Sequence, residues 1–229
     1  MGKQGASTSG QRIAGLVALP KRREKVLNNK DARESFTTCR DALFKACGKG
    51  YAHLLIAKKI KSDYIQGYLA FKRSPTFWFY SYGAHSECVF SYLARIVEKR
   101  KNPNPKNITI FKYLNIVGQN IEFLFEENKQ EDIKKAIEAD YLLLEDKKEI
   151  INKLKDLRDK FLFHLDKQAF LNKSFFPTNE INDTDIERLY LLIEEILNRY
   201  SVFFDETKMP YDLSSLKITF DMDFKAFEE

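Results

Sequence analysis

Apolar residues recur at helical spacing along most of the chain after residue 25. The clearest example is the segment 146–171, where apolar residues stand three or four positions apart: Ile150, Leu154, Leu157, Phe161 and Leu165. A second such segment opens at about residue 184 with the capping-box pattern Thr184-Asp-Ile-Glu187 and continues to about residue 204. Its apolar positions are Leu189, Leu192, Ile193, Ile196 and Leu197. Both segments predict amphipathic helices.

A long aromatic segment begins at Ser74-Pro75, where Ser suits the N-cap and Pro suits the first helical position. It continues to residue 101 and stops before Pro103 and Pro105, which cannot extend a helix. The segment is apolar on most of its circumference, so we expect the central, most buried helix here. Its aromatic residues are then core rather than a base-stacking surface: Phe77, Trp78, Phe79, Tyr80, Tyr82, Phe90 and Tyr92.

Shorter helices are predicted elsewhere. Residues 31–60 indicate two helices separated at Gly48 and Gly50, residues 108–127 a helix weakened at Gly118, and residues 131–144 a charged helix. The alternation after residue 215 is typical of a short strand, although no second strand is apparent to pair with it. Only 9 Gly and 6 Pro argue against a turn-rich all-β fold. The pattern predicts an all-α, up-and-down helical bundle with long central helices.

The chain of 229 residues, 44% of them hydrophobic, is long enough to bury a large core. We expect a disordered or leader segment over residues 1–25, with a transit peptide as the alternative, because this stretch is basic and rich in Gly and Ser. A helical domain over 26–205 and an acidic C-terminal tail over 206–229 complete the predicted organisation. No run of roughly 18 apolar residues could cross a membrane. We therefore expect a soluble, cytoplasmic protein with no membrane partner.

The net charge of +5 comes from the first 23 residues, which carry five basic and no acidic side chains. The rest of the chain is balanced, so the pI does not predict a basic nucleic-acid-binding body, and any such binding needs a local patch. Cys39, Cys47 and Cys88 are odd in number and lack CxxC spacing, which predicts three reduced thiols. Phosphate-binding Gly-rich loops, nucleophile elbows and HExxH motifs do not occur. We expect no cofactor and no bound metal.

Candidate chemistry lies in the segment 157–167. On a helix, Arg158 and His164 flank Phe161 at the centre of the apolar face, about 120° and roughly 9 Å apart. Lys160, His164 and Lys167 form a basic stripe. Charged residues at the edge of an amphipathic helix usually reach water, so helix geometry alone favours structural roles. His53 and His85 each stand alone in a helical run, and we expect them to be structural.

The sequence resembles the HEPN superfamily of α-helical domains, and within it the AbiU-like abortive-infection branch. The resemblance is carried by Arg158-Asp159 followed after four residues by His164, which matches the HEPN ribonuclease motif. The aromatic segment from Phe77 to Ile96 and the following 110–115 also fit, and the whole resemblance covers about residues 30–205. The chain departs from the family where a small residue precedes the motif His, because Phe163 is bulky.

The resemblance implies a function. HEPN ribonucleases cleave RNA without metal, using the neighbouring 2′-hydroxyl as the nucleophile, and they pair two motifs in a dimer. It assigns acid or base catalysis to His164, stabilisation of the phosphorane to Arg158 and orientation of either group to Asp159. Lys160 and Lys167 would contact RNA phosphates. The expected protein is a homodimeric, toxin-like effector of phage defence, with an antitoxin or nucleotidyltransferase as a further partner.

Two other interpretations remain open from the sequence. One is a non-catalytic HEPN module that binds nucleotide, RNA or a partner protein. The other is a helical scaffold in which Arg158 and His164 are surface residues. The enzyme requires both residues from two chains to converge on one open cleft, which neither alternative requires.

Overall fold

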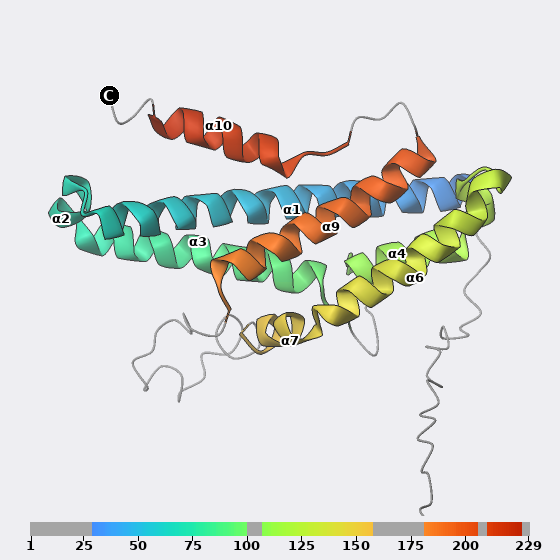
Figure 1. The fold of residues 1–229 in the computed structure, drawn as a ribbon, viewed down its shortest axis with the longest axis horizontal. Helices are drawn as coiled ribbons and strands as arrows, with labels where there is room; N and C mark the ends of the chain where they lie inside the picture. Colours follow the sequence, from blue (N-terminus) through green and yellow to red (C-terminus); the bar gives the residue numbers. More distant parts are fainter. Residues whose placement is uncertain (1–28, 100–106, 158–180, 206–209, 226–229) are drawn as a thin grey trace, which may run out of the picture.

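The computed structural model describes residues 29–99, 107–157, 181–205 and 210–225, and these are helical apart from their connections (Figure 1). The first helices are α1 (Asn29–Gln66), α2 (Leu69–Arg73) and α3 (Pro75–Ile96). They are followed by α4 (Ile110–Gln119), α5 (Ile121–Leu124), the 3₁₀ helix η1 (Glu127–Lys129), α6 (Gln130–Asp146) and α7 (Lys148–Leu157). The last are α9 (Asp183–Phe204) and α10 (Leu213–Lys225). The predicted all-α fold is confirmed, and the described residues contain no strand.

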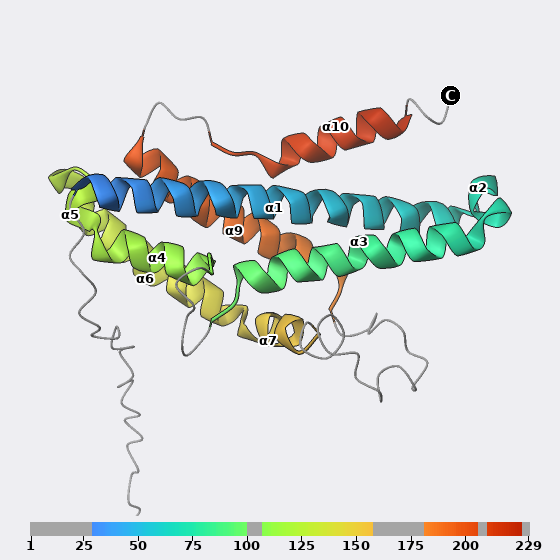
Figure 2. The same cartoon turned by 180° about the vertical axis from the view of Figure 1, so that it is seen from behind.

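Helices α1 and α3 form a long antiparallel hairpin closed by α2, and α9 crosses this hairpin obliquely (Figures 1 and 2). Helix α1 contacts α3, α9, α4, α5 and α10, so it is the central helix of the fold. Helix α7 packs on α3, and α6 connects α7 to the end of the fold where α4 and α5 lie. No helix in the described part of the chain is both long and apolar enough to span a membrane.

The expected break in α1 at its glycines is wrong, because α1 is one helix of 38 residues. Gly50 lies where α9 comes closest: a Cβ added there would be 2.1 Å from Oη of Tyr190 and 2.9 Å from Cβ of Tyr92. A Cβ on Gly48 would lie 2.1 Å from Oη of Tyr211. Each glycine costs an isolated helix about 1 kcal/mol. Packing of a tyrosine against each glycine offsets that cost, so these glycines mark contacts with α9 and with the segment before α10, and not a helix end.

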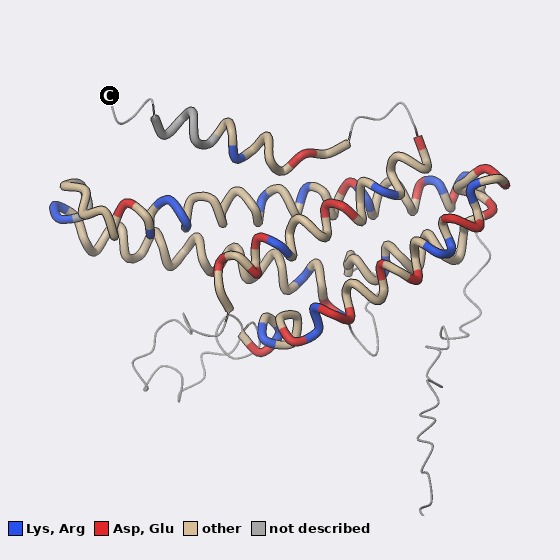
Figure 3. Tube along the Cα trace, in the orientation of Figure 1, with Lys and Arg blue, Asp and Glu red and all other residues tan. Residues whose placement is uncertain are grey.

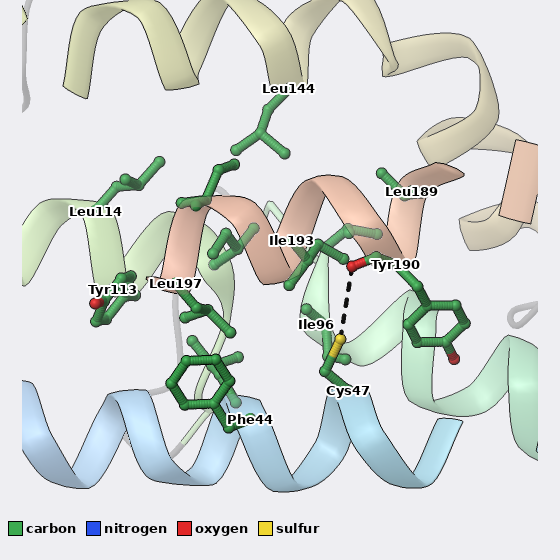
Figure 4. Packing of buried hydrophobic residues seen from close by; sticks show 14 of the residues in the cluster. Phe44, Cys47, Ile96, Tyr113, Leu114, Leu144, Leu189, Tyr190, Ile193 and Leu197 are labelled. Atoms are coloured by element: carbon green, nitrogen blue, oxygen red, sulfur yellow. Dashed lines mark hydrogen bonds between the residues drawn. The ribbon is translucent and has the colours of Figure 1, made fainter. Parts of the chain in front are cut away.

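Tyr190 joins α9 to both helices of the hairpin. It is completely buried, and its Oη donates a 2.9 Å hydrogen bond to the carbonyl of Val89 on α3. Its own carbonyl accepts from Sγ of Cys47 on α1 at 3.7 Å (Figure 4). Burial raises the pKa of Tyr190 well above its usual value, so the hydroxyl stays protonated and remains a donor. One residue therefore joins three helices.

Helix α3 is not the most buried helix. Its buried side chains lie towards the C-terminal end and include Val89, Leu93 and Ile96. Near its N-terminus, Phe77, Phe79 and Tyr80 are 62%, 53% and 67% exposed, so the aromatic segment is not core there. The reason is tertiary: α9 crosses the hairpin near its middle, and α2 and the start of α3 project beyond it (Figure 1).

The helix ends lie close to their predicted positions, but the predicted capping interactions differ from those in the structure. Ser74 occupies the N-cap of α3 without making a side-chain cap bond. The predicted helix over 108–127 is divided into α4 and α5, and the break falls at Asn120 and not at the predicted weak point, Gly118. Thr109 caps the start of α4 by accepting from the backbone N–H of Lys112. Helix α9 is capped by Asn182, two residues before the predicted Thr184, through the N–H of Asp185.

The C-terminal segment enters the core and forms a helix where a strand was expected. Leu213, the first residue of α10, is completely buried. The ring of Tyr211 packs on Phe44 with centroids 4.8 Å apart, and Asn198 exchanges hydrogen bonds of 2.6 and 2.8 Å with the Tyr211 backbone. A lone strand leaves its backbone polar groups unpaired, whereas a helix pairs them internally, which explains the difference.

We expect Gly50→Ala to destabilise the fold by about 1–3 kcal/mol, because the added methyl group meets a buried tyrosine that has no room to move. Gly118→Ala is the matched control. Its Cβ would meet only Cδ1 of Ile137, at 3.7 Å, and it should gain up to about 1 kcal/mol of helix propensity. Urea unfolding followed by circular dichroism measures both. Equal stability of the two variants would contradict the close contact at Gly50.

Candidate functional site

The residues predicted to carry the chemistry lie outside the described residues. Arg158, Asp159, Lys160, His164 and Lys167 all fall within 158–180, so their predicted arrangement stays a prediction. The described chain stops before them at Leu157, the last residue of α7, and resumes after them at Ile181. Both flanking side chains are buried, with 5% and 7% of their surface exposed. The last described residue before the motif and the first one after it are therefore both part of the core.

A small pocket lies beside the second attachment point, between α1, α3 and the start of α9. Its volume is about 120 Å³, well below the roughly 300–1,000 Å³ of most ligand sites. Its apolar lining residues are Leu54, Ala57, Val89, Phe90, Ile181 and Ile186, and its polar ones are Lys58, Lys61, Tyr82, Ser86 and Asp183. The space suits a small apolar group better than a nucleotide.

The charges around this pocket are already paired. Nζ of Lys58 donates to one carboxylate oxygen of Glu187 at 2.6 Å, and Oη of Tyr51 donates to the other at 3.1 Å. Burial alone would raise the pKa of Glu187, but these donors hold it below its usual value. Lys61 pairs with Asp183 at 2.8 Å. An incoming phosphate would have to break these ion pairs, so the pocket is not a ready anion site.

His53 and His85, each expected to stand alone, lie side by side across α1 and α3. Their Nδ1 atoms are 2.8 Å apart, and the ring of Tyr92 stacks on His53. Each histidine is sixteen positions from Leu69, the first residue of α2. In a hairpin that turns at Leu69, residues at equal distances on either side lie opposite one another, so His53 and His85 would be expected to meet. The sequence analysis missed this pair because the position of the turn was not known.

The two imidazoles can share only one proton, with one Nδ1 donating and the other accepting. Partial burial lowers the pKa of both histidines, and the neighbouring imidazole lowers that of His85 further. Among the described residues no group of three or more His, Cys, Asp or Glu side chains could hold a metal ion. The pair is therefore a neutral contact between helices in which each ring satisfies the other.

A buried carboxylate away from the pocket is also paired. Asp140 of α6 is completely buried and accepts hydrogen bonds from Tyr200, at 2.6 Å, and from Arg199. Burial raises the pKa of Asp140, while these two donors favour its charged form. All three cysteines are in the described part and none forms a disulfide, as predicted. Burial raises the pKa of Cys39 to about 11, so it is not an activated nucleophile.

Comparison with known proteins gives one finding. The sequence model of a HEPN family described as AbiU2 matches residues 49–223. This range contains the Arg158–His164 motif and the first part of α10, and it begins within α1. No curated protein and no solved structure matches the chain.

The histidine pair predicts how the stability of the fold depends on pH. Because the pKa of both imidazoles is lowered in the folded state, the unfolded chain binds more protons, and stability should fall as the pH drops below about 6.5. Urea unfolding at pH 7 and pH 5 tests this for the wild type and for His85→Gln. The variant should lose less stability between the two pH values. An equal loss in both proteins would show that the pair is not the cause.

Proposed function

The chain belongs to the AbiU2 family of HEPN domains, and on that basis we propose that it is a metal-independent endoribonuclease acting as a toxin-like effector in phage defence. One observation carries the proposal: the matched region contains an Arg, a polar residue, four further residues and a His, which is the arrangement of the HEPN ribonuclease motif. The motif follows directly after Leu157, which is buried in the core.

The proposed reaction is transfer of the phosphodiester to the neighbouring 2′-hydroxyl. A base removes the 2′-hydroxyl proton, the oxygen attacks phosphorus, and the bond to the 5′-oxygen breaks as an acid protonates it. The products are a 2′,3′-cyclic phosphate and a 5′-hydroxyl. Histidine side chains ordinarily change charge near neutral pH, which makes His164 a suitable group for either proton transfer. The planar guanidinium of Arg158 is suited to the extra negative charge of the phosphorane, and Asp159 to orienting Arg158 or His164.

The proposal includes a homodimer, which the resemblance to HEPN ribonucleases implies. The reaction needs one neutral and one protonated group, whereas each motif supplies a single histidine. We propose that two chains place their motifs in one cleft, where one His164 acts as base and the other as acid. Lys160 and Lys167 would bind the RNA phosphates on either side of the scissile bond.

We expect His164→Ala and Arg158→Ala each to lower cleavage of a labelled single-stranded RNA at least a hundredfold, because each removes a group acting in the transition state. Arg188→Ala is the matched control, since the Arg188 side chain is 72% exposed on α9. It should cleave as the wild type does, with EDTA present throughout. RNA binding without cleavage by the wild type would favour the non-catalytic module instead.

Mixing subunits tests the shared cleft. Refolding a fixed amount of wild-type chain with increasing His164→Ala chain should lower the activity per wild-type chain, because mixed dimers lack one of the two histidines. Gel-based cleavage assays measure this titration, with Arg188→Ala chain as the control diluent. Activity per wild-type chain that stays constant at every ratio would mean that one chain suffices.

A further inference from the structure

The far end of the α1–α3 hairpin exposes an unusual set of aromatic rings. We call residues 64–80, with the end of α1, α2 and the start of α3, the hairpin tip. Exposed aromatic side chains of the described residues all lie here: Tyr64, Tyr68, Phe77, Phe79 and Tyr80. Exposed large apolar residues elsewhere in the described chain, such as Leu142 and Ile218, are aliphatic. These aromatic side chains are therefore not part of the hydrophobic core, and packing in the core does not explain why they are aromatic.

The charge of the tip is positive (Figure 3). Lys72 and Arg73 at the end of α2 are exposed and have no acidic partner among the described residues. Asp63 is the only acidic residue between positions 58 and 82, and it pairs with Lys59 at 2.9 Å. The tip thus presents two cations beside exposed rings and offers no carboxylate to match them.

Exposed rings together with cations that have no acidic partner favour one kind of binding partner over another. In a two-fold contact of the tip with a second copy, the same patch faces itself, and residues 64–80 contain no acidic side chain to pair with Lys72 and Arg73. Single-stranded nucleic acid supplies what the tip lacks, with phosphates for the cations and flat bases for the rings. We propose that the hairpin tip binds single-stranded RNA, with bases on Phe77 and Tyr80 and phosphates on Lys72 and Arg73. This inference rests on the RNA substrate in the proposed function.

The geometry of the rings suits this role. Phe77 and Tyr80 are one turn apart on α3, a separation at which Cβ atoms lie about 5–6 Å apart on one side of the helix. Phe77 meets Trp78 edge to face, with ring planes at 77°, and Tyr80 meets Phe79 in the same way at 76°. With 62% and 67% of their surface exposed, Phe77 and Tyr80 retain area on which two bases can stack. The cations stand a few residues ahead of them on the chain.

Binding to a strand that cannot be cut tests the tip separately from catalysis. The probe is a fluorescein-labelled 2′-O-methyl RNA of mixed sequence, which lacks the 2′-hydroxyl nucleophile, and fluorescence anisotropy of the full chain gives the Kd. We expect Phe77→Ala combined with Tyr80→Ala to raise the Kd at least tenfold, since each stacked base contributes substantially to binding. The paired Phe77→Tyr and Tyr80→Phe variant keeps both rings and should bind within about twofold of wild type.

Two further measurements define the contacts. Leu142→Ala is the matched exposed control, because Leu142 is 72% exposed on α6, and its Kd should equal that of wild type. Replacing Lys72 and Arg73 by Ala should reduce the dependence of log Kd on log salt by roughly 0.7 for each lost phosphate contact. Duplex RNA should bind more weakly than the single strand, because its bases are not available for stacking.

The outcomes separate the two proposals. RNA binding that depends on Phe77 and Tyr80 without cleavage of unmodified RNA would support the tip and overturn the nuclease. Cleavage together with a Kd that is unchanged by the alanine pair, or with no detectable binding of the probe, would overturn the tip alone. If the alanine pair instead converts a dimer to a monomer in sedimentation and leaves the Kd unchanged, the tip is a contact between copies. Neither binding nor cleavage would overturn both.

Discussion

The absence of a side chain at residue 50 is the constraint on which the packing of α9 depends. Tyr190 fills the space where a Cβ would stand, and from there its hydroxyl reaches the carbonyl of Val89 on the neighbouring helix. This contact sets how closely α9 approaches the hairpin. From α9, Arg199 and Tyr200 then hold α6 through the buried Asp140. A contact on one side of α9 thereby positions helices on both sides of it.

The same packing determines which surfaces are left for function. The core follows α1 from Ala32 to Ile60 but includes only the C-terminal part of α3, from Gly83 onward, and the hairpin tip projects beyond the point where α9 crosses. The predicted catalytic motif lies outside the described residues, between Leu157 and Ile181, and Ile181 lines the small pocket. The proposed catalytic motif and the proposed strand-binding tip therefore belong to different stretches of the sequence.

Several local predictions failed for one common reason. The predictions of a helix break at the glycines and of a C-terminal strand both relied on the local preferences of single residues. Gly48 and Gly50 nevertheless stay helical, because Tyr211 and Tyr190 pack on them. Asn182, and not the predicted Thr184, is the N-cap of α9. Glu187 was the other residue of the predicted capping box, and it pairs instead with Lys58 and Tyr51 of α1. In each case a partner distant in the sequence changed the outcome.

The sequence alone determined the all-α class, the approximate extent of α3, α6 and α9, and the family, because periodicity and a short motif are carried by neighbouring residues. Only the tertiary structure decided that His53 meets His85, that α1 is the central helix, and that Phe77 and Tyr80 are exposed. Those features depend on where helices cross, and a crossing is fixed by side chains far apart along the chain. An apolar face shows that a helix has a partner, but not which helix covers it or how far along.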